Sequence, residues 1–222
     1  MPGAERDAVS QHSAFDTQHS LYPIVDATVC AARGIDPVDL ARAVIGAGAR
    51  LLQVRAKDLP DADFLALLDR AVRISRPQGA RVVVNDRADL ALMAGADGVH
   101  VGQEDLSVEQ VRSVVGGSSI VGVSTHDRAQ IDAALGGDAS YVAVGPVFAT
   151  ATKETGYEPR GLDLVRYAAG RGKPIVAIGG ITLERVPDVL AAGAWGLAVI
   201  TDLLRTGDPE GRARAYLRAC AA

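Results

Sequence analysis

The stretch AGARLLQVR, residues 47–55, combines the end of a helix, a tight turn and the start of a strand. Its glycine suits the left-handed backbone that satisfies the last carbonyls of a helix, and the apolar run after it suits a buried strand. Similar stretches recur as AGADGVHVG at 94–102, AGAWGLAVI at 192–200 and, more weakly, GGDASYVAVG at 136–145. The first two copies begin 47 residues apart and the third begins 98 residues further on, about twice that spacing. The pattern predicts a repeated helix–turn–strand unit with two units in each period.

Short apolar runs bounded by turn residues are the candidate strands: LYPIV at 21–25, LLQVR at 51–55, RVVVN at 81–85, GVHV at 98–101, IVGVS at 120–124, YVAVG at 141–145, IVAIG at 175–179 and LAVIT at 197–201. Helical patterns lie between them, including 37–46, 61–75 and 183–192. Because the runs are apolar on both faces and alternate with amphipathic helices, they predict parallel strands joined by crossovers. We therefore expect the α/β class and a single (β/α)8 TIM barrel over residues 20–222, preceded by a disordered polar tail at 1–19.

Charge and cysteine content restrict the class of partner. The formal net charge is −4, which gives no electrostatic footprint for a nucleic acid and no polybasic segment for an anionic membrane. Cys30 and Cys220 form no CxxC pair and no metal-ligand spacing, so free thiols in a reducing compartment are favoured over a disulfide framework. The apolar runs are far shorter than the ~20 residues that span a bilayer, and residues 1–19 resemble neither a secretory signal nor a transit peptide. We expect a cytoplasmic protein that binds no nucleic acid and no membrane.

Polar residues recur at the C-terminal end of nearly every candidate strand. That recurrence, with no GxGxxG after the first strand, favours the barrel over a doubly wound open sheet. In a (β/α)8 barrel the active site is assembled at these strand ends. Taken from the second strand to the eighth, the residues of this rim are Gln53, Arg55, Lys57, Asn85, Asp86, Arg87, His100, Gln103, Asp105, Ser124, Thr125, His126, Thr150, Thr152, Lys153, Gly179, Gly180 and Thr201.

Two pairs of charged rim residues suggest a bound anion and a bound metal. Arg55 lies inside an apolar run, where an unpaired guanidinium would be costly. We therefore favour contact with a bound anion over the alternative, in which Arg55 and Lys57 are two solvated side chains of a loop. Asp86 and Asp105 follow different strands, and two carboxylates completed by phosphate oxygens suit Mg²⁺. Helix capping by Asp86 is the alternative, and spacing alone leaves both open.

The segment AIGGIT, residues 177–182, indicates a phosphate site. Two glycines let the backbone approach a phosphate closely, and the recurrent phosphate site of this fold lies between the loops after strands seven and eight. A plain tight turn is the alternative. The segment GPVFATATKET, at 145–155, has no cysteine, histidine or activated serine, so it predicts an anion contact instead of a nucleophile. His100 is expected to be a satisfied core residue, whereas His126 could contact a substrate.

These residues support a barrel enzyme for two phosphorylated ligands but leave its reaction open. Seven ordered motifs then resemble one family: QVRAK at 53–57, NDR at 85–87, DGVHVGQED at 97–105, GVSTH at 122–126, GPVFATATK at 145–153, AIGGI at 177–181 and AVIT at 198–201. Together they resemble thiamine phosphate synthase, from about Leu21 to the last helix. The resemblance implies a transferase that couples 4-amino-2-methyl-5-(diphosphooxymethyl)pyrimidine with 4-methyl-5-(2-phosphooxyethyl)thiazole, or its carboxylate, and releases pyrophosphate. It also implies Mg²⁺ dependence and a dissociative pyrimidine cation.

The resemblance further implies a role for each matching residue. The pyrimidine diphosphate would be held by Gln53, Arg55, Lys57, Asn85, Ser124 and Lys153, and Mg²⁺ by Asp86 and Asp105. The thiazole phosphate would be held by Thr150, Thr152, the backbone of Gly180, Ile200 and Thr201, with Val54, Ala56 and Ala151 also in the substrate site. Arg55, Lys57, Ser124 and Lys153 would be catalytic, the three cations because they face the charge that grows on pyrophosphate.

Two other functions fit the same barrel. A thiazole tautomerase, the paralogue that this chain also resembles, would transfer a proton and would need neither a diphosphate site nor Mg²⁺. The presence of both Asp86 and Asp105 therefore favours the synthase. If the chain were a catalytically silent sensor of thiamine precursors, we would expect charged residues of the rim to have been lost, and they are present. The expected partners are the two small-molecule substrates, and a homo-oligomer is compatible with the sequence.

Overall fold

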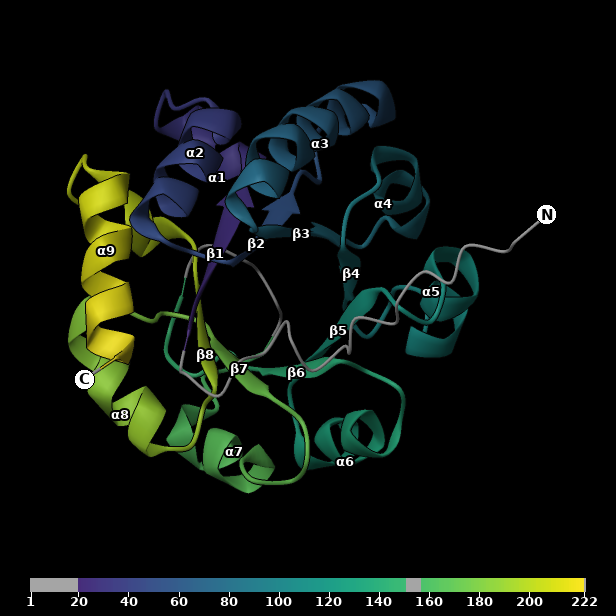
Figure 1. Ribbon diagram of the computed structural model, residues 1–222. Helices are drawn as coiled ribbons and strands as arrows, with labels where there is room; N and C mark the ends of the chain where they lie inside the picture. The colour runs from purple at the N-terminus through teal and green to yellow at the C-terminus, as the bar shows by residue number, and fades with distance from the viewer. Residues whose placement is uncertain (1–19, 151–156, 222) are drawn as a thin grey trace.

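The structure is a computed structural model that describes residues 20–150 and 157–221. Within these residues, eight parallel strands pair in sequence order and the last pairs with the first, so the sheet closes into a barrel (Figure 1). The strands are β1 Ser20–Asp26, β2 Leu51–Arg55, β3 Arg81–Asn85, β4 Gly98–Val101, β5 Ile120–Thr125, β6 Tyr141–Val144, β7 Ile175–Ile178 and β8 Gly196–Val199. The expected (β/α)8 barrel is confirmed. The predicted tail, residues 1–19, lies outside the described residues.

Helices surround the strands and form the outer layer in Figure 1. The α-helices are α1 Ala27–Ala32, α2 Pro37–Ala47, α3 Asp61–Ser75, α4 Ala88–Ala94, α5 Val108–Val115, α6 Arg128–Gly136, α7 Gly161–Ala168, α8 Val186–Ala191 and α9 Pro209–Cys220, and the short 3-10 helices are η2 Arg76–Gln78, η3 Leu183–Arg185 and η4 Thr201–Leu204. The helix predicted at 183–192 is divided into η3 and α8. Pro187 stands in the first turn of α8, where its missing N–H prevents one continuous helix. Helix α9 packs against α2 and α8 and completes the ring.

The recurring glycines end helices as the sequence pattern predicts. Gly48 and Gly95 are the C-caps of α2 and α4, with φ of +116° and +63°. Gly193, after α8, has φ of +92°. The weaker fourth copy differs, because Gly137, the C-cap of α6, has an extended backbone with φ of −88°. The strong copies therefore mark left-handed turns between helix and strand.

The core has two layers separated by the sheet. The inner layer fills the barrel and contains Tyr22, Ile24, Leu51, Val83, Ile120, Tyr141, Ala143, Val176 and Ala198. The larger outer layer lies between the sheet and the helices. The large ring of Tyr141 fits inside the barrel because Gly122 faces it without a side chain. A Cβ placed on Gly122 would lie 2.0 Å from Cζ of Tyr141.

We expect Gly122→Ala to lower the free energy of unfolding by about 1–3 kcal/mol, because the added methyl group overpacks the barrel interior. Denaturant titration with far-UV circular dichroism measures this change. Gly136→Ala is the matched control, since a Cβ at Gly136 would meet no atom within 4 Å. Equal stability of the two variants would contradict the packing argument.

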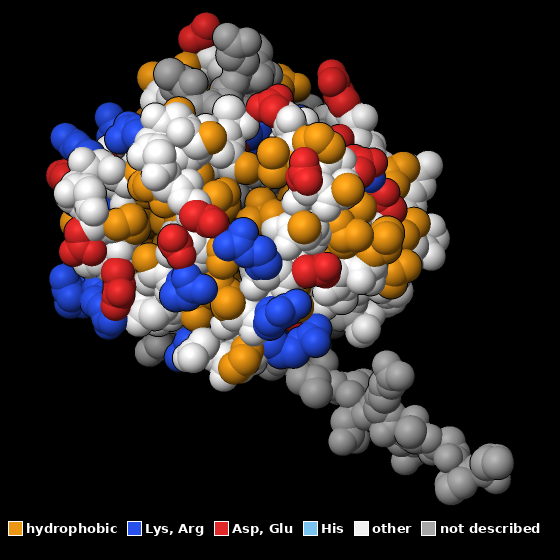
Figure 2. All heavy atoms as spheres, turned by 90° about the horizontal axis from the view of Figure 1, so that it is seen from above, with side chains coloured by type: hydrophobic (Ala, Val, Ile, Leu, Met, Phe, Trp, Pro, Cys, Tyr) orange, Lys and Arg blue, Asp and Glu red, His pale blue; other side chains and the backbone are white. Residues whose placement is uncertain are grey.

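The outer surface carries charges of both signs. Figure 2 views the molecule from above relative to Figure 1, and Lys and Arg side chains are interspersed with Asp and Glu on this face. Exposed ion pairs form at the surface, such as Arg42 with Asp39 at 2.6 Å and Arg70 with Asp36 at 3.0 Å. In residues 20–150 and 157–221, no helix is long and apolar enough to cross a membrane. The face in Figure 2 carries no extended field of one charge sign.

Candidate active site

Two adjoining cavities open at the C-terminal ends of the strands. The first lies within the barrel and is lined by residues of all eight strands, among them Tyr22, Ile24, Gln53, Arg55, Asn85, His100 and Ser124. The second lies over β5 to β8, has about 620 Å³ of empty space including open solvent, and is lined by Ser124, His126, Gly145, Thr150, Ile178, Gly180, Ile200, Thr201 and Asp202 among others. Residues that line both cavities are Ser124, Ile178, Ala198 and Ile200. The cavities therefore meet near the barrel axis.

Strand alternation determines which predicted residues reach the first cavity. Successive side chains of a strand point to opposite faces of the sheet. Gln53 and Arg55 line the cavity, whereas Val54 between them is fully buried in the outer core. Any contact of Val54 with a ligand would therefore be made by its backbone. Ala56, also predicted for the site, lines a neighbouring hollow together with Lys57 and Asp86.

Arg55 is held by a residue at the end of β1. Its Nη1 donates a hydrogen bond to Oδ2 of Asp26, which is only 1% exposed. The Asp26 carboxylate also accepts a hydrogen bond of 3.0 Å from the backbone N–H of Val29 and so caps α1. The partner that Arg55 requires is thus supplied in part by a carboxylate of the protein itself, and the expected contact with a bound anion stays a prediction. Among the described residues, however, its buried Nε has no hydrogen-bond partner, which leaves one donor for a ligand.

The two predicted metal ligands lie together beside Lys57. Burial raises the pKa of Asp86, the negative charge and hydrogen bond of Asp105 raise it further, and Lys57 lowers it. Lys57 Nζ lies 3.5 Å from Oδ2 of Asp86. The capping alternative is wrong, because Arg87 is the N-cap of α4 and no side chain caps that helix. Asp86 instead has φ of +65°, a left-handed conformation that Asp and Asn tolerate better than most residues.

This carboxylate pair fits a hard divalent cation. In the part of the chain that the structure describes, no three or more His, Cys, Asp and Glu residues form a metal site. Two carboxylates supply only part of a Mg²⁺ coordination shell, and Mg²⁺ is commonly held by one or two carboxylates plus substrate phosphates and waters. The repulsion that raises the pKa of Asp86 is also what a bound cation would relieve. The donor set therefore fits Mg²⁺ that arrives with a phosphorylated ligand.

A chain of hydrogen bonds crosses the barrel interior. Gln53 Nε2 donates to the hydroxyl of Tyr22 at 3.3 Å, and the Tyr22 and Tyr141 hydroxyls are 2.8 Å apart. His100 lies 2.8 Å from the Tyr141 hydroxyl through Nδ1 and 2.8 Å from Ser124 Oγ through Nε2. His100 is 6% exposed, so the expectation of a satisfied core histidine is confirmed. The chain links two predicted substrate residues on opposite sides of the cavity, Gln53 and Ser124.

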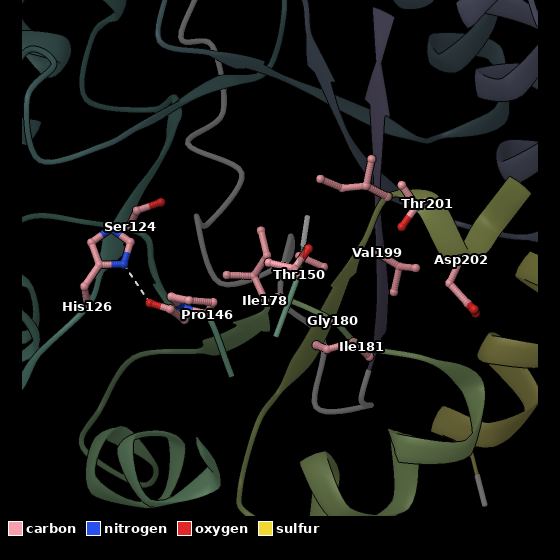
Figure 3. A pocket seen from close by; sticks show the side chains of 14 residues that line it. Ser124, His126, Pro146, Thr150, Ile178, Gly180, Ile181, Val199, Thr201 and Asp202 are labelled. Carbon is pink, nitrogen blue, oxygen red and sulfur yellow. Dashed lines mark hydrogen bonds between the residues drawn. The ribbon is translucent and has the colours of Figure 1, made fainter. Parts of the chain in front are cut away.

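Glycines at the end of β7 let the chain after β6 pass close to it. The backbone N–H of Phe148 donates to the Gly179 carbonyl at 3.0 Å. Gly180 has φ of +61°, and a Cβ there would lie 2.4 Å from the Ala149 carbonyl oxygen. This approach brings Thr150 into the lining of the second cavity. In Figure 3, Thr150 lies between the side of the cavity that holds Ser124 and the side that holds Thr201.

Three predicted residues lie outside the described residues: Ala151, Thr152 and Lys153. The rim residues Arg87 and Gln103 have structural partners. Arg87 forms ion pairs with Asp61 and Asp89, and Gln103 Nε2 donates to the Ser124 carbonyl at 2.5 Å. His126 lines the second cavity, where its Nδ1 lies 2.6 Å from the Gly145 carbonyl oxygen. Asp105 instead lines a separate hollow, where its Oδ2 accepts a hydrogen bond of 2.7 Å from the backbone N–H of Gly102. Thr125 is fully buried, and its hydroxyl donates to the Ala143 carbonyl at 2.9 Å. The other predicted residues line one of the cavities or the hollow beside them: Gln53, Arg55, Ala56, Lys57, Asn85, Asp86, Ser124, Thr150, Gly179, Gly180, Ile200 and Thr201.

Sequence reasoning missed four residues that shape the site: Tyr22, Asp26, Tyr141 and Asp202. The rule that polar residues at strand ends form the rim would have found Asp26, had the first strand been extended by one residue. Asp202 follows Thr201 directly and could have been found in the same way. The two tyrosines carry no such signal, because in sequence they are indistinguishable from core residues of apolar strands.

The sequence and the fold of this chain are similar to those of known proteins. The family model described as "Thiamine monophosphate synthase" matches residues 21–203. The thiamine-phosphate synthase of Anaeromyxobacter dehalogenans (strain 2CP-C) is 44% identical over an alignment of 204 residues, and the alignment covers 86% of this chain and 91% of that protein. That of Mycobacterium sp. (strain KMS) is 42% identical and covers 89% of this chain and 90% of its own. A solved structure, thiamine phosphate pyrophosphorylase from Pyrococcus furiosus, has a TM-score of 0.81 at 28% identity, with 91% and 95% of the chains covered.

Proposed function

This chain belongs to the thiamine monophosphate synthase family of transferases, and from that premise we propose that it joins a pyrimidine diphosphate to a thiazole phosphate with Mg²⁺. The substrates are 4-amino-2-methyl-5-(diphosphooxymethyl)pyrimidine and 4-methyl-5-(2-phosphooxyethyl)thiazole or its carboxylate. One observation carries the proposal: two cavities of different chemistry meet at Ser124. One has paired carboxylates and cations beside it, and the other is bounded by a glycine turn. This arrangement suits two phosphorylated substrates that react where the cavities join.

The pyrimidine diphosphate is assigned to the first cavity. Gln53, Asn85 and Ser124 offer hydrogen-bonding groups for the ring, and the burial of all three makes their orientation definite. The unused Nε of Arg55 and the ammonium of Lys57 lie on the side where the diphosphate would extend. Asp86 and Asp105 would hold Mg²⁺ against it. Bound there, Mg²⁺ supplies charge neutralisation of the diphosphate.

The thiazole phosphate is assigned to the second cavity. Gly180 lets the backbone approach a phosphate, and Thr150 and Thr201 supply hydroxyl groups from two other loops. Ile200 lines both cavities and offers an apolar wall for the thiazole ring. The nitrogen of the thiazole would then face the carbon that bears the leaving group.

The proposed reaction replaces one bond to the pyrimidine methylene carbon by another. The carbon–oxygen bond breaks with its electron pair going to pyrophosphate, and the thiazole nitrogen gives its lone pair to the resulting cation. Arg55 and Lys57 stabilise the charge that grows on the leaving group. Lys153, expected to act with them, lies outside the described residues. No covalent nucleophile is required, because the protein positions two bound substrates and stabilises a leaving group.

Pyrophosphate release tests the proposal. Purified protein is given each substrate alone, both together, and both together after chelation of Mg²⁺. Release that needs both substrates and the metal, with thiamine phosphate as the organic product, is the expected result. Conversion between thiazole carboxylate tautomers without coupling would support the tautomerase instead. Binding of both ligands with neither reaction would support a sensor.

A further inference from the structure

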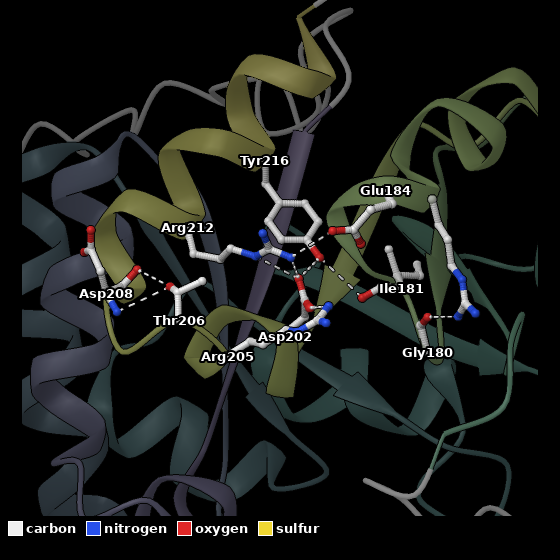
Figure 4. A network of polar contacts seen from close by, with 10 residues as sticks. Gly180, Ile181, Glu184, Asp202, Arg205, Thr206, Asp208, Arg212 and Tyr216 are labelled. Carbon is white, nitrogen blue, oxygen red and sulfur yellow. Dashed lines mark hydrogen bonds and ion pairs between the residues drawn. The ribbon is translucent and has the colours of Figure 1, made fainter.

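A buried carboxylate adjoins the proposed phosphate site but faces away from it. Asp202 belongs to η4 directly after Thr201, lines the second cavity and is 7% exposed. Arg212 of α9 donates to its Oδ2 through Nε at 3.0 Å and Nη2 at 2.7 Å. Figure 4 shows the Asp202 side chain pointing to α9, where Arg212 and Tyr216 meet it. The arginine offsets a negative charge that would otherwise repel a phosphate in the adjoining cavity.

Tyr216 connects this carboxylate to the other side of the phosphate site. Its hydroxyl donates to Asp202 Oδ2 at 2.5 Å and lies 3.3 Å from the backbone carbonyl oxygen of Ile181. Asp202 follows β8, whereas Ile181 follows β7. Burial, and then the hydrogen bond to Asp202, raise the pKa of Tyr216, so the hydroxyl keeps the proton that it donates. One side chain from α9 therefore contacts both loops that bound the proposed phosphate site.

The loop after β7 is braced from its other side as well. Arg185 Nη1 donates to the Gly180 carbonyl at 2.5 Å, and the Arg185 guanidinium lies 4.2 Å from the centre of the Phe148 ring. Gly180 and Ile181 are adjacent, so Arg185 and Tyr216 contact two successive carbonyl groups of this loop.

We infer that Tyr216 is a positioning residue for the thiazole phosphate, and that it acts by fixing the loops after β7 and β8 relative to each other. The inference rests on the proposed function, because the phosphate concerned belongs to the second substrate. Tyr216 is fully buried and lines neither cavity, so it touches no ligand. Its effect reaches the substrate only through Asp202 and the Ile181 carbonyl. A small change in the spacing of two such loops is costly, because the phosphate is held by groups from both.

Tyr216→Phe tests the inference, because it removes the hydroxyl and keeps the ring. We expect the KM for the thiazole phosphate to rise about 5- to 10-fold, because the substitution removes one well-made hydrogen bond. The kcat at saturation and the KM for the pyrimidine diphosphate should stay within about 2-fold. The unphosphorylated thiazole alcohol should react as well with the variant as with the wild type. A purely structural defect would instead reduce the fraction of protein that is active. The apparent kcat would then fall, and both KM values would stay unchanged.

Tyr167→Phe is the matched control. The Tyr167 hydroxyl also binds a carboxylate, that of Asp132 at 2.9 Å, but it lies on the outer face of the barrel. This control should change neither KM. Arg212→Lys is a second variant that keeps the charge and loses the two-pronged contact with Asp202, and it should raise the same KM by a smaller factor. If circular dichroism shows that Tyr216→Phe is unfolded, Arg212→Lys tests the inference by itself.

Two results distinguish failure of the inference from failure of the proposed function. If the wild type couples the two substrates and both variants keep its KM for the thiazole phosphate, the positioning role is refuted. If the wild type does not couple them, the proposed function fails, and inorganic phosphate serves as the probe. Thermal stabilisation by inorganic phosphate should then be weaker in Tyr216→Phe than in the wild type, and equal stabilisation would refute the role of Tyr216.

Discussion

Asp86→Asn should lower turnover by about 100-fold or more while leaving the Tm of the metal-free protein equal to, or above, that of the wild type. The pKa of Asp86 is raised by burial and by Asp105, so its ionised carboxylate opposes folding at neutral pH. Asparagine removes that charge. It also tolerates the left-handed backbone of this position, where φ is +65°. Activity should therefore fall while stability is kept or rises, as expected for a carboxylate whose role is to bind a cation.

The measurement is a set of two assays with and without Mg²⁺: pyrophosphate release and thermal unfolding. Mg²⁺ with the diphosphate substrate should raise the Tm of the wild type and not that of the variant. Asp89→Asn, three residues further on, is the control. The hydrogen bond from Arg87 lowers the pKa of Asp89, so this carboxylate favours folding, and its removal should lower the Tm slightly with no effect on turnover. A destabilised, fully active Asp86→Asn would refute the metal role of Asp86.

Arg55→Met should be the most destabilising of the proposed substitutions, with a loss of about 3–5 kcal/mol in the free energy of unfolding. It leaves the Asp26 carboxylate only 1% exposed and without its cation. Turnover should fall by about 100-fold or more, because a cation aimed at the leaving group is lost. Denaturant titration and pyrophosphate release measure the two effects.

The double variant Asp26→Asn with Arg55→Met separates stability from catalysis. It removes both charges, and asparagine can still cap α1 by accepting the hydrogen bond from Val29. Most of the stability should return, whereas turnover should remain as low as in Arg55→Met. Recovery of turnover together with stability would show that Arg55 acts only as the partner of Asp26. Equal stability of the single and double variants would show that the buried pair contributes little.

The sequence predicted the rim well where strand ends carry polar residues. Gln53, Asn85 and Ser124 line the expected cavities, and Asp86 and Asp105 interact as an expected pair should. That success has a simple cause: all eight parallel strands end at the same rim of the barrel, and alternate side chains of each strand point into it. Val54 shows the limit of the same reasoning: it lies inside a site motif, but its side chain points into the outer core. Motif membership therefore does not imply a side chain in the site.

The sequence by itself determined the closed barrel, the order of its strands and the family. Local signals were sufficient because each helix–turn–strand unit carries its own apolar run and its own terminating glycine, as at Gly48 and Gly95. Only the tertiary structure decided which groups are partners: Asp26 with Arg55, Tyr22 with Tyr141, and Tyr216 with Asp202. Asp26 lies 29 residues from Arg55, and Tyr22 lies 119 from Tyr141. Such contacts are set by barrel closure and burial, since a buried polar group requires a partner but the sequence does not specify which one.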